Sequence, residues 1–307
     1  MGTNSIKLLV ADVQGHDVRP LIEESKQTRL GKGFYETHQL LPEPIEATAQ
    51  AVAKFAGIAR EYKAESIHVI ATSAARDATN AEALTSAIQK ASGLKVEIIS
   101  GDQEADWVFQ GVTTDARLAS APILLLDAGG GSTEFILGQG DQKHFRASFP
   151  LGTVRLMETL PHSDPPTPAE LAACRKWLGN FLEREVRPAL EPALKREKRQ
   201  SGSDGDVILV GTGGTVSILA RIEKKLESYD REQIEATVIP LNRVVWHVEH
   251  LWSLPLEQRK EIAGLPKRRA DVILTGVLIY QAIMKAFSFS ELRVSTRGLR
   301  FAAVMQQ

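Results

Sequence analysis

The sequence predicts an α/β protein built from two domains, and three observations lead to this prediction. The chain has 307 residues, of which 43% are hydrophobic, so it can form two cores of ordinary size. Apolar strand-like runs alternate with segments of helical spacing along the first third of the chain. The same alternation begins again after residue 121. We therefore expect one domain over residues 1–118 and a second over residues 119–307.

The first domain is expected to begin with two strands. Residues 5–13 (SIKLLVADV) are rich in β-forming side chains, residues 14–17 have the composition of a turn, and residues 19–29 have the character of a second strand. Further along, apolar residues recur at helical spacing or form short buried runs. These segments predict helices over 44–62, 80–91 and 101–112, with Asn80 as an N-cap, and strands over 66–72 and 95–100.

The second domain is expected to repeat this alternation. A helix should begin at Thr167, because Pro168 stands at its first position and Glu170 completes a capping box. The polar residues 198–206 are expected to form an exposed loop. The other predicted elements are strands over 122–127, 133–137, 207–210 and 292–295, helices over 168–198, 242–252 and 269–286, a helix after residue 215, and a terminal helix that packs back on the first domain.

Composition excludes several classes of protein. The net charge is −1, so no global basic field would attract nucleic acid, and a polyanionic substrate would need a locally basic cleft. The single cysteine, Cys174, excludes a disulfide framework and a cysteine-rich zinc site. The first residues lack the pattern of a signal peptide, and no apolar run is long enough to span a membrane. We therefore expect a cytoplasmic protein.

The strongest chemical motif is residues 127–134 (DAGGGSTE), which follows a buried apolar strand. The strand ends in a carboxylate, and three glycines then allow backbone N–H groups to approach a phosphate without a Cβ in the way. Ser132 and Thr133 add hydroxyl donors, and Asp127 and Glu134 are suited to hold Mg²⁺ directly or through water. The alternative is a hairpin turn with incidental glycines. The strand-end Asp and the Ser-Thr-Glu sequence favour a phosphate loop.

Two further glycine-containing segments have a similar setting. Residues 211–215 (GTGGT) follow a buried strand and open a helix, which suits an anion, although a tightly packed strand–helix turn explains them equally well. Residues 2–5 (GTNS) precede an apolar strand, and by themselves they are compatible with an unstructured terminus. Because each predicted domain contributes one such loop after a strand position, the loops can hold a phosphate chain from both sides.

Glu104 lies in residues 100–105 (SGDQEA), where the last strand of the first domain leads into a helix. In the crease between domains, this carboxylate can accept a proton from a water that attacks phosphorus. The alternative is an acid in the first helical turn that stabilises the helix dipole, which is a common arrangement.

These four motifs, in this order, resemble the exopolyphosphatase and guanosine pentaphosphate phosphohydrolase (Ppx/GppA) family. Further matches lie at residues 29–33 (RLGKG), 72–80 (TSAARDATN), 269–274 (RADVIL) and 292–300 (LRVSTRGLR). The resemblance implies two ribonuclease-H-like domains of the actin superfamily with an active site between them. It also implies Mg²⁺-dependent release of terminal phosphate from polyphosphate, from guanosine pentaphosphate or from both, by a protein expected to be a homodimer.

The resemblance also assigns roles to residues. It implies that Glu104 is catalytic and that Asp127 and Glu134 hold the metal and phosphate. The residues expected to bind phosphate are Gly2, Thr3, Asn4, Ser5, Arg76, Gly129, Gly130, Gly131, Ser132, Thr133, Gly213, Gly214 and Thr215.

The sequence departs from the family pattern at its start. The family's first loop reads Asp-x-Gly-[Ser/Thr]-Asn-Ser, and here Met1 occupies the x position. Either the first phosphate site is damaged, or the functional chain begins upstream with an apolar strand ending in Asp, and we expect the second. Gln103 and Asp106 also differ from the usual Glu and Arg. The chain resembles the short form of the family, so we expect no long basic channel and equal handling of short and long polyphosphates.

Three functions remain open from the sequence. A hydrolase is the first, a non-catalytic protein that senses polyphosphate or guanosine tetraphosphate is the second, and an ATP-dependent kinase of the same fold is the third. Glu104 and the absence of a sugar-binding signature disfavour the kinase, and a phosphate-release assay separates the first two. The basic run at residues 267–269 is either a solvated surface segment or a contact for a phosphate chain.

Overall fold

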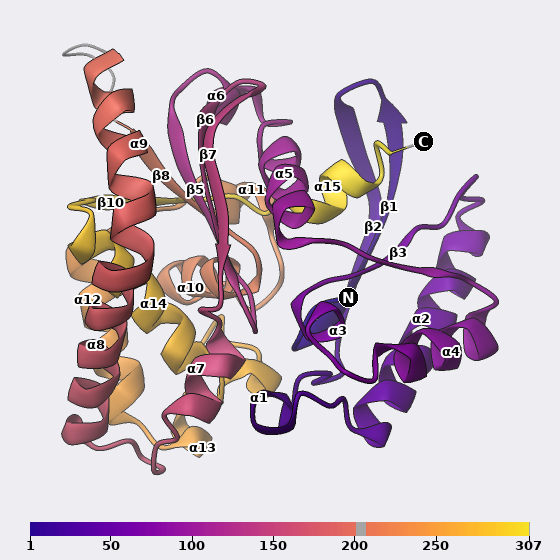
Figure 1. Ribbon diagram of the computed structural model, residues 1–307, viewed down its shortest axis with the longest axis horizontal. Coiled ribbons are helices and arrows are strands. Elements are labelled where there is room, and N and C mark those ends of the chain that lie inside the picture. The colour runs from indigo at the N-terminus through magenta and orange to yellow at the C-terminus, as the bar shows by residue number, and fades with distance from the viewer. Residues whose placement is uncertain (201–206, 307) are drawn as a thin grey trace.

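The computed structural model describes residues 1–200 and 207–306. It contains two α/β halves that lie side by side, with helices α5 (Gly101–Val112) and α15 (Leu299–Ala303) between them (Figure 1). The larger half is formed by residues after 121 and the smaller half by residues before 100. The predicted α/β class with two halves is confirmed.

The second half is built around one six-stranded sheet with the order β7-β6-β5-β8-β10-β9. Strands β5, β6 and β7 form an antiparallel meander, whereas β8 and β10 run parallel to β5. The strand bounds are β5 Ile123–Ala128, β6 Thr133–Gln139, β7 Gln142–Phe149, β8 Ile208–Thr212, β9 Val238–Pro240 and β10 Glu291–Val294.

Both faces of this sheet are covered, which explains why β5 is a continuous apolar run. Leu124 and Leu126 belong to the main core cluster, while Ile123 and Leu125 face the cluster formed with α5. The larger helices of this half are α7 Thr153–Thr159, α8 Pro168–Phe181, α9 Arg187–Gln200, α10 Gly214–Lys224, α12 Leu241–Ser253 and α14 Ile273–Ala286. Shorter helices are α11 Arg231–Glu235, α13 Leu256–Arg259 and a 3₁₀ turn over Lys267–Arg269.

The predicted elements of this half hold with some corrections. The capping box of Thr167 and Glu170 is confirmed. The helix expected over 168–198 is interrupted by a π-helical turn at Leu182–Val186 and ends at Gln200, and most of the loop predicted after it lies outside the described residues. The helix expected from residue 269 begins only at Ile273. Strands β7 and β9 and helices α7, α11 and α13 were not predicted, because most are short or lack a strong apolar period.

The first half contains two separate two-stranded sheets. One is the antiparallel hairpin of β1 (Ser5–Gln14) and β2 (Asp17–Gln27), and the other is the parallel pair β3 (Val69–Ala71) and β4 (Val96–Ile98). The strands predicted over 66–72 and 95–100 are thus much shorter in the structure. The helices of this half are α1 Phe34–Thr37, α2 Pro42–Glu61, α3 Ser73–Arg76 and α4 Ala81–Ser92.

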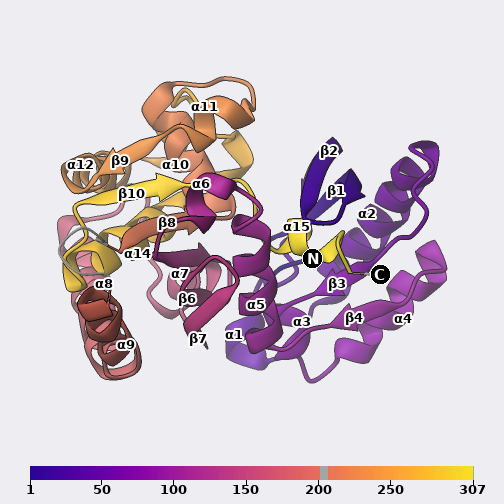
Figure 2. The same ribbon diagram turned by 90° about the horizontal axis from the view of Figure 1, so that it is seen from above.

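Met1 lies beside β3, between the two small sheets. Its ammonium group donates to the carbonyl of Ile70, and its own carbonyl accepts from the N–H of Thr72 at 3.1 Å. Figure 2 shows the N-terminus and α15 between the β1–β2 hairpin and β3. Asn80 stands at the N-cap position of α4 as predicted, but its side chain caps no N–H of the helix and instead makes two hydrogen bonds with the backbone of Leu40, at 2.8 and 3.0 Å.

Helices α5 and α15 join the halves. The apolar side of α5 packs against β5 and β6 and includes Val108 and Phe109. Arg300 of α15 reaches the first half, where it donates to the carbonyl of Leu8 at 2.7 Å and to the carboxylate of Glu23 at 2.9 Å. A short helix, α6 (Ala116–Ala119), leads from α5 into β5.

None of the described helices combines the length and apolar character needed to cross a membrane.

Candidate active site

The glycine-rich turn between β5 and β6 is held in place from below by helix α7. The N–H of Gly129 donates to the carbonyl of Ser132 at 2.9 Å, which closes the turn. The first N–H groups of α7 donate to the carbonyls of Gly129 and Gly130 at 2.9–3.0 Å. The carbonyls of the turn are therefore bonded to the protein on one side, and the loop is rigid.

The N–H groups of the same turn are differently placed. Within residues 1–200 and 207–306, the backbone N–H groups of Gly130, Gly131 and Ser132 donate to no acceptor of the protein. Successive N–H groups without partners in a tight turn form a concavity that binds anions. The loop thus offers the backbone donors that the sequence predicted for phosphate.

The loop of residues 2–5 shows the same pattern in the first half. The carbonyls of Thr3 and Asn4 accept hydrogen bonds of 2.7–3.2 Å from the segment around Gly31, which fixes the loop. The N–H groups of Thr3 and Asn4 have no acceptor in the described part of the chain. The Asn4 amide is only 7% exposed, and its Oδ1 accepts from Gln27 while its Nδ2 is left without a partner. A buried amide donor without a partner suits an anionic ligand.

These two loops touch each other across the two halves. A Cβ atom at Gly130 would lie 2.8 Å from Cβ of Thr3, and one at Gly131 would lie 2.3 Å from the hydroxyl of Tyr35 and 2.4 Å from that of Ser73. No side chain larger than hydrogen fits at either position. The structure therefore brings the two predicted phosphate loops together and shows them in direct contact.

The third glycine segment lies beside Asp127. Gly213 has a φ of 92°, and a Cβ there would lie 2.3 Å from Oδ1 of Asp127. Only glycine is compatible with this backbone and this neighbour. A Cβ on the adjacent Gly214 would lie 3.1 Å from the guanidinium of Arg269, and Arg269 also donates to the hydroxyl of Ser5 at 3.2 Å. The structure thus unites the loops around residues 2–5 and 211–215 near one buried arginine.

Asp127 and Glu134 lie directly opposite each other on β5 and β6, so their side chains share one face of the sheet. The Glu134 carboxylate accepts from the hydroxyls of Ser132 at 2.7 Å and Ser148 at 2.8 Å. Burial raises the pKa of Glu134 well above its usual value of 4.5, and the charges of Glu104 and Asp127 raise it further. Burial also raises the pKa of Asp127, and the Lys7 ammonium opposes that rise.

Glu104 reaches this cluster from the other half. It stands in the first turn of α5, where the hydroxyl of Ser100 caps the helix by accepting from the N–H of Gln103 at 3.1 Å. Its carboxylate is nearly buried and accepts from Arg76 Nη1 at 3.0 Å. Burial raises the pKa of Glu104, and Arg76 is the main opposing influence. A desolvated carboxylate with a raised pKa is suited to take a proton.

Some predicted phosphate ligands have their side chains engaged elsewhere. Arg76 is bound to Glu104 and to the carbonyl of Ile99, so the structure places it as a partner of the predicted base. The hydroxyl proton of Ser132 is donated to Glu134, and that of Thr133 to the carbonyl of Leu151. In this structure the backbone N–H groups are the available donors, and the role of these two hydroxyls toward phosphate stays a prediction. The role of Arg76 toward phosphate stays a prediction.

Sequence reasoning missed Arg155, which connects the halves at the phosphate loops. Its Nε donates to the carbonyl of Gly131 at 2.8 Å, its guanidinium lies 4.1 Å from the ring centre of Tyr35, and its Nη2 is 3.4 Å from Asp77. The only signal for it was its position in a helix start after Gly152. Ser148 was also given no role, and Arg269 was considered only as part of the basic run 267–269, since a contact between distant segments has no signature in one sequence.

The carboxylates fit a magnesium ion chemically. Asp127, Glu134 and Glu104 are buried oxygen donors whose like charges oppose each other's ionisation, so a bound cation would relieve the repulsion. Among the residues described, no three Asp, Glu, His or Cys side chains are close enough to hold a metal by themselves. Mg²⁺ commonly binds through one or two carboxylates together with waters and substrate phosphates.

Two α/β halves, with glycine-rich loops that meet beside a buried carboxylate cluster, define a class of proteins with a site between two halves. Residues 9–306 match the Ppx/GppA phosphatase family, and the chain belongs to that family.

Similar proteins agree with this assignment. Exopolyphosphatase 2 of Mycobacterium tuberculosis is 33% identical over 296 residues, which cover 92% of this chain and 88% of that protein. The structure of the Aquifex aeolicus PPX-GPPA enzyme is 29% identical with a TM-score of 0.77, covering 100% of this chain and 97% of that one. The structure of an exopolyphosphatase from Cytophaga hutchinsonii is 26% identical with a TM-score of 0.84, covering 99% and 94% respectively.

Proposed function

We propose that this protein hydrolyses the terminal phosphoanhydride bond of inorganic polyphosphate, of guanosine pentaphosphate or of both. One observation carries the proposal. Backbone N–H groups without protein acceptors, in the loops of residues 2–5 and 129–132, lie in the same interdomain site as the buried carboxylate of Glu104. Anion donors beside a desolvated base are the two parts that phosphoryl transfer to water requires.

Glu104 acts as the general base in this proposal. Its carboxylate accepts a proton from water as the water oxygen attacks the terminal phosphorus, and the bond to the bridging oxygen breaks. Arg76 holds the carboxylate in place at 3.0 Å and opposes the rise in the pKa of Glu104 that burial causes. The loop N–H groups receive the charge that develops on the phosphoryl oxygens.

Asp127 and Glu134 would hold Mg²⁺ in this site. When bound, the ion neutralises phosphate charge and polarises the phosphoryl oxygen. The hydrogen bonds from Ser132 and Ser148 orient the Glu134 carboxylate toward one face of the sheet. The relative named exopolyphosphatase 2 supports polyphosphate as a substrate, while guanosine pentaphosphate rests on the family resemblance.

The experiment is a substrate panel with and without Mg²⁺. Purified protein is incubated with tripolyphosphate, long-chain polyphosphate, guanosine pentaphosphate and ATP, and phosphate release is measured. We expect Mg²⁺-dependent release from at least one of the first three. If binding occurs without release from any of them, the protein senses the ligand and is not a hydrolase. Release only from ATP would contradict the proposal. Cytoplasmic location and a homodimer stay predictions, the latter checked by light scattering.

A further inference from the structure

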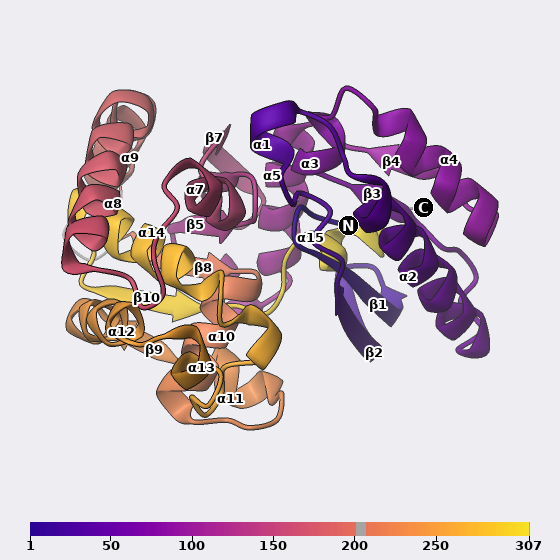
Figure 3. The ribbon, with the colours of Figure 1, turned by 90° about the horizontal axis from the view of Figure 1, so that it is seen from below.

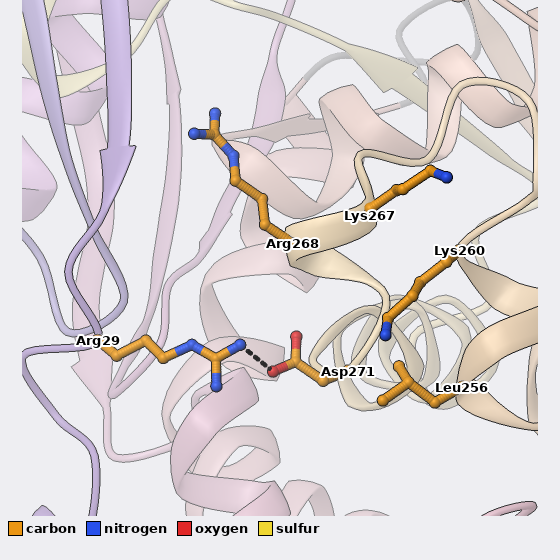
Figure 4. Close-up of a pocket in the computed structure, with 6 residues that line it drawn as sticks. All are labelled: Arg29, Leu256, Lys260, Lys267, Arg268 and Asp271. Carbon is orange, nitrogen blue, oxygen red and sulfur yellow. Dashed lines mark hydrogen bonds and ion pairs between the residues drawn. The ribbon is translucent and has the colours of Figure 1, made fainter.

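A basic cavity lies next to the site, at the boundary of the two halves. Its volume is about 380 Å³, and it is lined by Leu256, Asp271 and four cationic side chains, which are Arg29, Lys260, Lys267 and Arg268. Arg29 comes from the segment after β2, and the other residues come from the region between α13 and α14 (Figure 4; Figure 3 shows these elements from below). The cavity therefore has a strong excess of positive charge.

This cavity adjoins the first phosphate loop. A smaller cavity beside it is lined by Thr3 and Asn4 of the first phosphate loop, and it shares Arg29 and Asp271 with the basic cavity. Asn4, whose Nδ2 has no hydrogen-bond partner among the described residues, is one of the residues that line this smaller cavity. A ligand bound at the loop can thus extend past Arg29 into the basic cavity.

The ion pairs of these cations are easily exchanged. Arg29 pairs with Asp271 at 2.8 Å, Lys260 with Glu257 at 2.6 Å, and Lys267 with Glu261 at 2.9 Å. Glu257 and Glu261 are 80% and 71% exposed, so these pairs are weak and leave the ammonium groups free to meet another anion. Within the described ranges, Arg268 donates to the carbonyl of Ser25 alone, at 3.2 Å.

The arrangement fits an extended anion and not a nucleoside. Figure 4 shows the cationic groups spread around Asp271 and not converging on one point. Leu256 is the single apolar lining residue, and the lining contains no aromatic ring on which a base could stack. A linear chain of phosphates places one charge after another along such a surface.

We propose that Lys260, Lys267 and Arg268 form a subsite for the distal phosphates of linear polyphosphate, which leaves the catalytic site past Arg29. The inference rests on the proposed function and selects linear polyphosphate as the substrate class that uses this surface. It replaces the expectation from the sequence that chain length matters little, because a long chain reaches contacts that tripolyphosphate does not.

The test compares the triple variant K260Q/K267Q/R268Q with a control that removes the same charge elsewhere, K90Q/K195Q/R184Q. Lys195 is a close match for Lys267, since it is 66% exposed and pairs with Glu191 at 3.1 Å. We expect the KM for long-chain polyphosphate to rise about tenfold in the triple variant, with a weaker salt dependence, as three weak contacts are lost. The kcat, and the KM for tripolyphosphate and guanosine pentaphosphate, should stay within about twofold.

Any of three results would overturn the inference. The triple variant could leave the KM for long chains unchanged, or the control variant could raise that KM equally. In the third, the triple variant would raise the KM for guanosine pentaphosphate as much as the KM for long chains. If the wild-type protein releases no phosphate at all, the proposed function fails, and the subsite is then judged by equilibrium binding of long-chain polyphosphate. In that case weaker binding by the triple variant supports the subsite, and equal binding overturns it.

Discussion

The two halves of the chain differ in how their described strands are joined. In the second half the six strands β7-β6-β5-β8-β10-β9 form one sheet, with β5 in its interior between β6 and β8. In the first half β1 and β2 form one sheet, β3 and β4 form another, and Met1 bonds the backbone of Ile70 in β3 and of Thr72 directly after it. The glycine-containing turn follows β5 in the second half and follows Met1 in the first. The segments that lead into the two turns therefore correspond, namely Asp127-Ala128-Gly129 and Met1-Gly2.

The difference teaches that two similar glycine-containing loops can be fixed by different partners. In the second half the loop is fixed by the β5–β6 ladder and by α7. In the first half, the loop is fixed from the other side, through backbone bonds between Thr3 and Gly31 and between Asn4 and Thr28. Helix α15 covers part of the gap, since Arg300 bonds the Leu8 carbonyl and Ala303 packs with Ile70.

The largest effect is expected at Glu104, the proposed general base on helix α5 between the two halves. The Glu104→Gln variant should lower kcat by about 10²–10⁴-fold with polyphosphate binding retained, since an amide cannot accept the proton of water. Phosphate release and equilibrium binding are measured together. Glu82→Gln is the matched control, because Glu82 also lies in a first helical turn, that of α4, but is exposed. Activity of the Glu104 variant within twofold of wild type would remove Glu104 from catalysis.

The second effect concerns the centre of the first half. We predict that placing the β5 residues Ile123–Asp127 (ILLLD) directly before Met1 supplies a strand between β1 and β3. A buried backbone group without a partner costs about 1–3 kcal/mol, so pairing several should raise Tm by roughly 5 °C or more. Turnover should rise as well, because the added Asp would stand where Asp127 stands in the other half. Scanning calorimetry and phosphate release are the measurements.

The control for this extension has the sequence ILPLD, in which proline removes a ladder donor. It should give a smaller rise in Tm. An unchanged Tm with ILLLD, or equal gains with both extensions, would show that the first half does not accept a central strand.

A smaller effect is expected at Arg155, which joins the two phosphate loops. The Arg155→Lys variant keeps the charge but loses the planar fork that contacts Gly131, Tyr35 and Asp77 together. We predict a decrease of about tenfold in kcat/KM, which corresponds to roughly 1.4 kcal/mol of lost positioning. Steady-state kinetics measure it, with Arg184→Lys as control, since Arg184 is an exposed arginine of the same half. If kcat/KM is the same in the two variants, Arg155 contributes to packing and not to the positioning of the loops.

The smallest effect is on stability at Glu134. Because burial raises its pKa, the folded protein holds this proton more tightly than the unfolded chain, and stability falls as pH rises above the usual value of 4.5. The Glu134→Gln variant should therefore have a higher Tm than wild type at pH 8, and no advantage near pH 4. Mg²⁺ should raise the Tm of wild type more than that of the variant. If the Tm of the variant and the Tm of wild type change in parallel with pH, Glu134 does not set the pH dependence of stability. If Mg²⁺ raises both Tm values equally, Glu134 does not hold the metal.

The sequence by itself determined the α/β class and the positions of the strongest elements. A run such as Ile123 to Leu126 can only be a buried strand, and the Thr167 capping box begins a helix by local hydrogen bonds alone. The glycine turns were also readable, since glycine at residues 129–131 and 213 reports close approach of other groups. Short elements such as β9 and α13 were missed, since they are stabilised by contacts with distant residues and carry no period of their own.

Only the tertiary structure decided which polar groups meet. Glu104 and Glu134 belong to different halves, and their mutual effect on pKa arises from packing of α5 against β6 and β7. Likewise, the contacts of Arg155 with Tyr35 and of Arg29 with Asp271 join segments more than a hundred residues apart. A single sequence specifies local conformation through side-chain periodicity and capping. The geometry of a site between two halves depends on the relative placement of both cores, for which one sequence contains no direct signal.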